Sequence, residues 1–227
     1  MTSLTTLRKV SLFSGLTEED LGVLAEMLGK RTFGKGVIIF HRDSPGHTLY
    51  IIETGKVRIF LLSESGQEIS LNIYGPGESF GELALLDGLP RSAGAVTLER
   101  TVVLTLHRDQ FLHHLEAQPL MARRIMEMLS QRLRYTTDYA GGLAFLDVYG
   151  RVAAKLLEMA DRYGVESDDG MEIDLRLTQA ELAGWVAATR EFVNKVLGTY
   201  RDQGLIKIDG QRITIVNRQG LRNRVSY

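Results

Sequence analysis

The sequence predicts an α+β fold with three consecutive parts: a β-rich N-terminal part, one long helix and a helical C-terminal part with a hairpin. Three observations support this prediction. Short β-branched runs separated by glycine and proline fill residues 31–107, a helical pattern covers residues 119–146, and two helix-capping signals precede a pair of alternating strands near the C-terminus. The corresponding domain boundaries are predicted at 1–118, 119–146 and 147–227.

The composition is that of a globular protein. The 227 residues are 44% hydrophobic and 24% charged, both close to ordinary globular values. The sequence has no apolar run long enough to span a membrane, and its N-terminus lacks the pattern of a signal peptide. The absence of cysteine excludes disulfides and cysteine-ligated zinc or iron–sulfur clusters. We therefore expect a cytoplasmic protein with no membrane partner.

The N-terminal part begins with a helix and continues as strands. Thr17 is a suitable N-cap for a short amphipathic helix over residues 17–29, which has acids in its first turn. Because no helical segments separate the β-branched runs, an antiparallel sandwich or barrel is predicted rather than a parallel sheet. The predicted strands cover residues 37–40, 48–53, 56–62, 68–74 and 100–106.

The long helix carries a continuous apolar seam. Pro119 suits the first helical position, and a helix from there to about residue 146 would be roughly 42 Å long. Such a seam either packs on the helix's own domain or pairs with a second copy of the chain, and its length and regular spacing favour a homodimer. The seam positions alternate spacings of four and three: Ala122, Met126, Leu129, Leu133, Thr136, Ala140 and Leu143.

Another amphipathic helix is predicted after the long one. Asp147 is a suitable N-cap, and Gly164 is a suitable end. Residues 143–147 would then form a hinge between the long helix and the C-terminal part. The polar stretch that follows Gly164 is predicted to be a loop with a short strand or hairpin.

Two capped helices in the C-terminal part form a candidate helix-turn-helix. Thr178 caps the first, and Glu181 completes a capping box. A short turn at Ala187–Ala188, where a glycine is more usual, leads to Thr189, which caps the second helix. In such a motif the first turn of the second helix enters the DNA major groove. Its outward residues are predicted to be Arg190, Glu191, Asn194 and Lys195, and its inward residues Phe192, Val193, Val196 and Leu197.

Two further features of the C-terminal part favour DNA over an ordinary helical hairpin with a solvated charged face. Two alternating strands, joined by a predicted turn at Asp209–Gly210, would form a wing. Residues 176–227 contain nine Lys/Arg and four Asp/Glu, a net charge of +5, while the rest of the chain carries −6. A basic segment beside an acidic body is expected when only that segment meets phosphates.

The segment FGELALLDGLPRSA, residues 80–93, has the composition of a phosphate site. Gly81 allows close approach of the backbone, and the N–H groups that follow it suit an anion-binding helix N-terminus. Arg91 would bind a phosphate through charge-assisted hydrogen bonds, Ser92 would add a hydroxyl donor, and Glu82 suits a ribose hydroxyl. Any one of these residues alone is better explained as part of a surface loop. The candidate ligand-binding residues of this segment are Gly81, Glu82, Leu83, Ala84, Arg91 and Ser92.

The order of these motifs resembles the CRP/FNR family of bacterial transcription regulators, and its cyclic-AMP receptor protein branch in particular. The resemblance covers about residues 10–216. It implies a cyclic-nucleotide-binding β jelly-roll, a long dimerisation helix and a C-terminal winged helix-turn-helix that binds DNA. The matching stretches are GKGVIIF at 34–40, LYIIETGKVRIF at 49–60, FGELALL at 80–86, PRSA at 90–93, RLRYTTD at 132–138 and LAFLDVYGRVA at 143–153, followed by the helix-turn-helix.

The resemblance also implies roles for particular residues. Residues matching Arg91, Ser92 and Gly81 hold the phosphate of the ligand in that family, and one matching Glu82 holds its ribose. Thr136 and Thr137 match a pair of hydroxyl residues that reaches the adenine. This match favours cyclic AMP over cyclic GMP. Thr136 also lies on the predicted dimer seam, where a polar residue costs stability unless something satisfies it.

The base-reading residues of the family match Arg190, Glu191 and Lys195. Many relatives have arginine at the last of these positions, so a lysine there removes a planar two-pronged donor. Phe192 stands where relatives often have a small hydroxyl residue, so one phosphate contact is expected to be missing. The cysteine-free sequence excludes the iron–sulfur sensing of the FNR branch, and its five histidines show no haem-ligand pattern.

The resemblance therefore predicts a homodimer that binds palindromic double-stranded DNA, uses cyclic AMP as an allosteric effector, needs no metal and contacts RNA polymerase. Cyclic AMP would shift the dimer toward its DNA-binding state. Two alternatives remain at this point: a regulator that ignores ligand and keeps a relic pocket, and a cyclic-nucleotide-binding regulatory subunit with no DNA role. No catalytic pattern of carboxylates, nucleophiles or metal ligands is evident, so no enzyme is expected.

Overall fold

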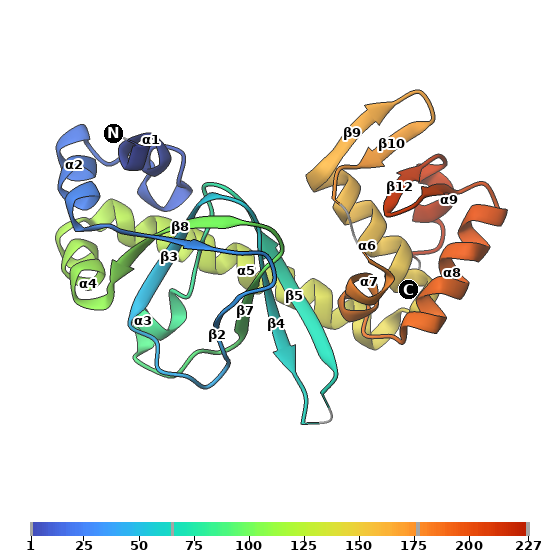
Figure 1. The fold of residues 1–227 in the computed structure, drawn as a ribbon, viewed down its shortest axis with the longest axis horizontal. Coiled ribbons are helices and arrows are strands. Elements are labelled where there is room, and N and C mark those ends of the chain that lie inside the picture. The colour runs from blue at the N-terminus through green and yellow to red at the C-terminus, as the bar shows by residue number, and fades with distance from the viewer. Residues whose placement is uncertain (1, 65, 176–177, 226–227) are drawn as a thin grey trace. The chain divides into compact units, whose positions relative to one another are not determined.

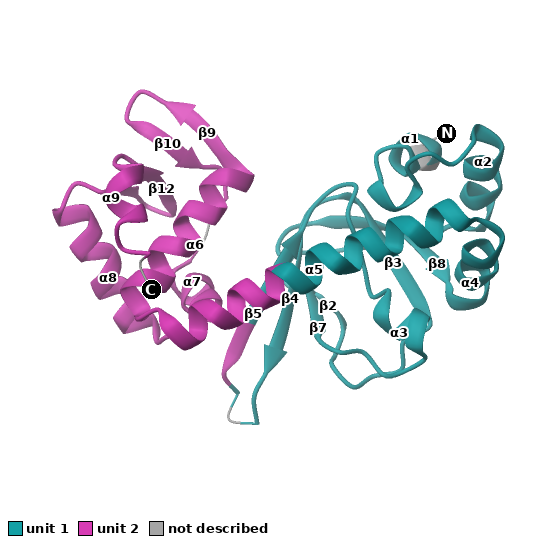
Figure 2. Cartoon of the chain, turned by 180° about the vertical axis from the view of Figure 1, so that it is seen from behind, with its two compact units in different colours: residues 1–66, 70–134 teal, residues 67–69, 135–227 magenta. Residues whose placement is uncertain are grey.

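The computed structural model describes residues 2–64, 66–175 and 178–225 (Figure 1). The chain divides into two compact units, one of residues 1–66 and 70–134 and the other of residues 67–69 and 135–227 (Figure 2). The long helix α5 (Pro119–Phe145) continues from the first unit into the second. Arg176, which contributes to the charge of the C-terminal segment, lies outside the described residues. No helix in the described part of the chain is both long and apolar enough to cross a membrane.

Two antiparallel four-stranded sheets form the first unit, as the sequence predicts. Their strand orders are β1-β8-β3-β6 and β2-β7-β4-β5. The sequence analysis missed β1, β6 and β7, because β6 and β7 are short and the GKRTF sequence of β1 is mostly exposed. The strands are β1 (Gly29–Phe33), β2 (Ile38–Phe40), β3 (Thr48–Thr54), β4 (Val57–Leu62), β5 (Glu68–Tyr74), β6 (Ser79–Phe80), β7 (Gly94–Thr97) and β8 (Thr101–His107).

The first unit also contains short helices: α1 (Thr2–Leu7), α2 (Glu18–Met27), α3 (Leu83–Asp87) and α4 (Arg108–Ala117). Thr17 caps α2, since its hydroxyl accepts from the backbone N–H of Asp20, which confirms the predicted N-cap. One apolar cluster joins the helices to the sheet that contains β3 and β8. It includes Leu24 of α2, Leu49 of β3, Leu104 of β8, Phe111 of α4 and Met121 of α5.

The second unit contains the predicted helix after α5 and the helix-turn-helix. Asp147 caps α6 by accepting from the N–H of Gly150 at 2.8 Å, as expected. One sheet with the order β11-β12-β10-β9 completes the unit. Its elements are α6 (Val148–Tyr163), β9 (Gly164–Ser167), β10 (Gly170–Ile173), α7 (Gln179–Trp185), α8 (Arg190–Asp202), β11 (Ile206–Asp209), β12 (Arg212–Ile215) and α9 (Arg218–Arg222).

The wing hairpin β11–β12 turns one residue later than predicted. Asp209 is the last residue of β11 and pairs with Arg212, so the turn residues are Gly210 and Gln211. Gly210 has a φ of +59°, which suits a tight hairpin turn. The aspartate-glycine pair therefore predicted the hairpin correctly, but the predicted turn position was one residue too early.

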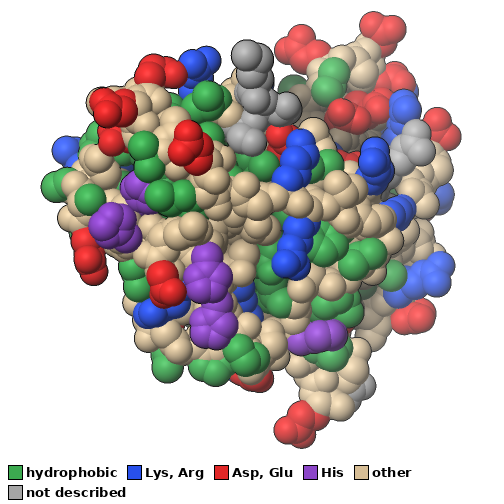
Figure 3. Space-filling view, turned by 60° about the vertical axis from the view of Figure 1, so that its left-hand side comes forward, with side chains coloured by type: hydrophobic (Ala, Val, Ile, Leu, Met, Phe, Trp, Pro, Cys, Tyr) green, Lys and Arg blue, Asp and Glu red, His purple; other side chains and the backbone are tan. Residues whose placement is uncertain are grey.

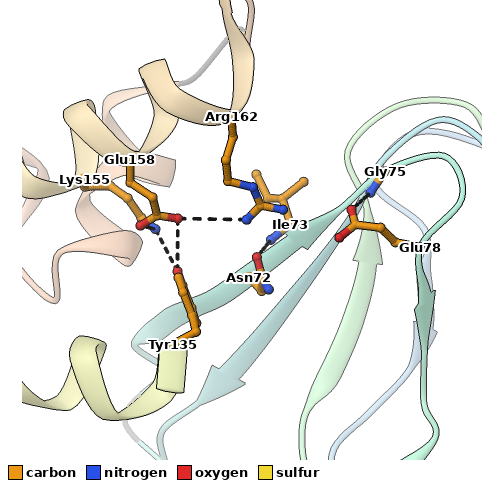
Figure 4. Close-up of polar contacts among 8 residues, drawn as sticks. All are labelled: Asn72, Ile73, Gly75, Glu78, Tyr135, Lys155, Glu158 and Arg162. Atoms are coloured by element: carbon orange, nitrogen blue, oxygen red, sulfur yellow. Dashed lines mark hydrogen bonds and ion pairs between the residues drawn. The ribbon is translucent and has the colours of Figure 1, made fainter. Parts of the chain in front are cut away.

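A polar cluster around the buried Lys155 joins α5 and α6 within the second unit (Figure 4). The Lys155 side chain is 5% exposed, and its Nζ donates to Tyr135 Oη at 3.0 Å and to Glu158 Oε2 at 2.7 Å. The same Nζ lies 3.9 Å from the ring centroid of Trp185 on α7. This lysine therefore ties the end of the long helix to the first helix of the helix-turn-helix.

Candidate functional sites

We call the segment 80–93 the cassette. Its arginine, Arg91, is buried in the protein interior and does not lie on the surface. Its side chain is 4% exposed, Nη1 donates to the carbonyl oxygen of Gly81 at 2.7 Å, and Nη2 donates to that of Thr48 at 2.7 Å. The guanidinium carbon lies 4.3 Å from the ring centroid of Phe40, and Nε has no acceptor among the described residues. Burial lowers the pKa of Arg91. A bound anion would compensate this buried positive charge and could accept a hydrogen bond from Nε.

Two glycines make room for this guanidinium. Gly81 has a φ of +84°, and a Cβ built there would lie 2.5 Å from Nη1 of Arg91. A Cβ on Gly46 would lie 2.8 Å from Nε of the same arginine and 2.5 Å from the Cβ of Ala84. The sequence analysis predicted the role of Gly81 but gave no role to Gly46. Neither position has space for a larger residue.

Glu82, the predicted ribose contact, is paired with an arginine of the long helix. The carboxylate is 3% exposed, and Nη1 of Arg132 lies 2.5 Å from its Oε1. The Arg132 guanidinium also donates to the carbonyl oxygen of Ser79 and stacks over Tyr74, with its carbon 4.6 Å from the ring centroid. Burial opposes the charge of Arg132, but Glu82 and Tyr74 outweigh it, so the pKa of Arg132 is raised. Any hydroxyl that binds Glu82 would share the carboxylate with Arg132, a residue that the sequence analysis left without a role.

The remaining cassette residues divide into buried and exposed ones. Glu82 is the N-cap of α3, and Leu83 and Ala84 are its first residues, so their N–H groups lie where a helix has no internal acceptors. Ala84 is buried, Leu83 is 41% exposed and the side chain of Ser92 is exposed. The structure thus brings Gly81, Glu82, Ala84 and Arg91 together. Ser92 follows Arg91 in the sequence, and its side chain lies at the surface.

The two threonines predicted to reach the adenine lie on α5. Thr136 is four residues, or about one helical turn, beyond Arg132, and Thr137 follows it. Both side chains are exposed. Both belong to the second compact unit, so their contact with a ligand in the cassette stays a prediction.

The helix-turn-helix forms from the capping signals that predicted it. Thr178 accepts from the N–H of Glu181 at 3.1 Å, and the Glu181 carboxylate accepts from the N–H of Thr178 at 2.7 Å, which confirms the capping box. Thr189 caps α8 by accepting from the N–H of Phe192 at 3.2 Å. Ala187 adopts a φ of +48° in the turn, a left-handed conformation that explains why glycine is more usual there.

The faces of α8 agree with the prediction at all but one position. Arg190, Glu191, Asn194 and Lys195 are exposed, while Val193, Val196 and Leu197 are buried. The prediction that Phe192 faces inward is wrong. Its side chain is 39% exposed, because the residue lies at the edge of the buried stripe and its ring packs edge-on against Tyr149, outside the core.

Ion pairs with acids elsewhere in the same unit neutralise part of the positive charge that the sequence predicted for residues 176–227. Three basic side chains form ion pairs with acids that precede residue 176, namely Lys207 with Asp169, Arg212 with Glu172 and Arg218 with Asp161. Residues 135–175 of the same unit carry nine Asp/Glu against three Lys/Arg. The exposed cations Arg190 and Lys195 on α8 are therefore the charges best placed to meet phosphates or bases.

The histidines belong to the first unit, and Figure 3 shows histidine side chains spread over one face of the molecule. His47 and His107 stack with ring centroids 6.4 Å apart, and both are exposed. Within residues 2–64, 66–175 and 178–225, no group of three or more His, Asp or Glu side chains is placed to hold a metal ion.

Family models match both sites. The cyclic nucleotide-binding domain matches residues 30–118, which include the cassette, and the Crp-like helix-turn-helix domain matches residues 150–224, which include α7 and α8. Fold and sites together define a class of protein: a DNA-binding transcription regulator with a cyclic-nucleotide-binding domain.

Relatives over nearly the whole length identify the family. The CRP-like cAMP-activated global transcriptional regulator of Mycobacterium tuberculosis H37Rv is 34% identical over 96% of this chain and 97% of its own. The cyclic AMP receptor protein of Thermus thermophilus is 34% identical over 87% of this chain and 88% of its own. Among solved structures, FixK2 of Bradyrhizobium japonicum superposes with a TM-score of 0.78 at 25% identity, over 88% of this chain and 98% of that one. The chain belongs to the CRP/FNR family of transcription regulators, which confirms the resemblance read from the motifs.

Proposed function

We propose that this protein is a cyclic-AMP-responsive transcription regulator that binds palindromic DNA as a homodimer. The observation that carries the proposal is Arg91: a buried cation with a free Nε, beside the buried carboxylate of Glu82, which pairs with the partly exposed Arg132. The names of the Mycobacterium tuberculosis and Thermus thermophilus relatives support cyclic AMP as the effector. Binding to DNA would place the protein in the cytoplasm, with RNA polymerase as a further partner.

In this proposal each part of the nucleotide has its own residues. Arg91, Ser92 and the N–H groups from Gly81 to Ala84 bind the cyclic phosphate. Glu82 accepts from the ribose hydroxyl, and Thr136 and Thr137 hydrogen-bond the adenine. The site requires no metal, since the anionic phosphate is balanced by an arginine.

Exposed apolar side chains on α5 support the homodimer. Met126, Leu133 and Leu143 are 61%, 68% and 37% exposed, and all three are positions of the predicted seam. A helix seam of this kind becomes buried when two copies pair. A twofold dimer would present two copies of α8 to half-sites about one helical turn of DNA apart. On each half-site Arg190, Glu191, Asn194 and Lys195 would read bases, while Thr178 and Thr189 would approach the backbone.

Titration of the protein against a fluorescently labelled operator tests the proposal directly. We expect cyclic AMP to tighten DNA binding by roughly 5- to 150-fold, the usual range of allosteric coupling. Equal affinity with and without cyclic AMP would contradict the ligand-gated function. Absence of calorimetric heat with cyclic AMP would then favour a regulator with a relic pocket, and absence of salt-dependent DNA binding would favour a regulatory subunit.

A further inference from the structure

An exposed aromatic side chain stands on the DNA-facing helix. Phe192 is the third residue of α8 and is 39% exposed, although the residues on either side of it in the sequence are a glutamate and a buried valine. It occupies the first turn of α8, because its N–H donates to the capping hydroxyl of Thr189. That turn is the part of a recognition helix that enters the major groove.

The ring of Phe192 is held in place from behind. It packs edge-on against Tyr149 of α6, with ring centroids 6.0 Å apart and an interplanar angle of 78°. Tyr149 packs in the same way against the buried Tyr200 at 6.2 Å, and Tyr200 Oη donates to the backbone oxygen of Tyr149 at 2.7 Å. The three rings form a row that ends at the surface with Phe192, so the exposed part of its ring is rigidly presented.

The neighbours of Phe192 on the helix surface are the residues expected to meet DNA. Lys195 lies three residues further along and is therefore adjacent on the same side of the helix. Glu191 precedes Phe192, and both Glu191 and Lys195 are exposed. A phenyl ring at this position has no donor for a phosphate, so the group it would bind in the groove must be apolar.

We propose that Phe192 contacts the C5-methyl group of a thymine in each half-site and thereby adds a base preference to DNA binding. The thymine methyl is the apolar group that the major groove offers, and phenylalanine is among the side chains that pack on it. The inference rests on the proposed function, since it requires that α8 binds duplex DNA. It adds a source of specificity that hydrogen bonding by Arg190 or Glu191 does not supply.

The test replaces thymine with deoxyuridine, which removes only the methyl group. Operators are first selected from random duplexes with the wild-type protein, and each thymine of the half-site is then replaced in turn. At one thymine position, replacement by deoxyuridine should weaken wild-type binding by roughly 3- to 5-fold for each half-site that is substituted. This loss corresponds to the free energy of burying one methyl group. Phe192→Ser should bind the thymine and deoxyuridine versions of that position equally well, while any sensitivity at other positions stays.

Two control variants and one stability measurement accompany this experiment. Val165→Ser changes another exposed apolar side chain of the same unit, 55% exposed and located in β9, and should keep the wild-type sensitivity to deoxyuridine. Lys195→Ala should weaken binding and reduce its salt dependence but also keep that sensitivity. Because Phe192 packs on Tyr149, thermal melting checks that Phe192→Ser is folded, and Phe192→Leu provides a second variant with an apolar side chain.

The possible results distinguish failure of the methyl contact from failure of the proposed DNA binding. If wild type binds the deoxyuridine operators as tightly as the thymine ones, or if Phe192→Ser loses as much as wild type does, the methyl contact is wrong while DNA binding stands. Because leucine is also apolar, Phe192→Leu is expected to keep some of the sensitivity. If the selected half-sites contain no thymine, the inference is also wrong. If no duplex is selected, the proposed function fails and the inference fails with it.

Discussion

The cassette and the recognition helix α8 are built in opposite ways. In the cassette, Glu82 and Arg91 are 3% and 4% exposed, and their partners come from other strands and from α5. On α8, Arg190 and Lys195 are exposed and lie outside the buried stripe of the helix. A substitution in the cassette should therefore change stability together with ligand affinity, whereas one on α8 should change DNA affinity and leave stability almost unchanged.

The largest effect is expected at Arg91. Arg91→Gln removes the buried cation and should weaken cyclic AMP binding by about 2–5 kcal/mol, because truncation of one partner in a buried charge pair leaves the other unpaired. Isothermal titration calorimetry measures this loss. Arg91→Lys is the control: it keeps the charge but loses the two-pronged geometry, and its loss should be smaller. Wild-type affinity in Arg91→Gln would show that the cassette does not hold the phosphate.

The next effect is expected at Gly81, where the backbone and the guanidinium meet. Gly81→Ala combines a left-handed backbone with a Cβ 2.5 Å from Arg91 Nη1, so we expect a loss of about 2–4 kcal/mol in unfolding free energy. Gly66→Ala is the matched control, since Gly66 has a similar φ of +82° with no atom within 4 Å of a built Cβ. It should lose only the backbone contribution, about 1–2 kcal/mol. Equal losses in urea denaturation would show that the cassette has room to adjust.

Local patterns in the sequence were enough to predict most of the fold and the DNA-binding motif. The caps at Thr17, Asp147, Thr178 and Thr189 each depend on residues three apart, and all four form as expected. Strand runs and helical periodicity are equally local. Consecutive residues therefore carried enough information to place these elements.

The features that were missed depend on distant partners or on fine register. Arg132 is fifty residues from Glu82, and nothing near either residue indicates their ion pair. The exposure of Phe192 depends on where Tyr149 of α6 packs against α8. The acids that neutralise Lys207 and Arg212 come from a separate hairpin, so the charge count along the chain overestimated the basic surface. Tertiary packing, rather than residue type, decided each of these.

A smaller effect, confined to function, is expected on α8. Arg190→Ala should weaken operator binding by about 1–3 kcal/mol and relax the preference at one base, as for loss of a bidentate base contact. Its thermal stability should stay within about 0.5 kcal/mol of wild type, because the side chain is exposed. Fluorescence anisotropy and thermal melting measure the two quantities. A marked loss of stability in Arg190→Ala would remove the contrast between the two regions.

The smallest effect concerns Lys155, a buried cation in the DNA-binding unit that resembles Arg91 in its burial. Burial lowers the pKa of Lys155, although Glu158 opposes this shift. The folded state then holds this proton less tightly than the unfolded state, so this group makes the protein more stable as pH rises from the lowered pKa toward the ordinary value of 10.5. Lys155→Met should reduce that rise in urea denaturation curves. The change at pH 7 should stay within about 1 kcal/mol, because the apolar side chain removes the cost of burying the cation while Glu158 keeps Tyr135 and Arg162 as partners.

Lys207→Met is the matched control, since Lys207 is an exposed lysine with a single carboxylate partner. Because this ion pair lies at the surface, Lys207→Met should change the unfolding free energy by less than about 1 kcal/mol. The same pH dependence in Lys155→Met and Lys207→Met would mean that burial does not distinguish the two cations. The contrast between buried charges in the cassette and exposed charges on α8 would then not extend to the stability of the DNA-binding unit.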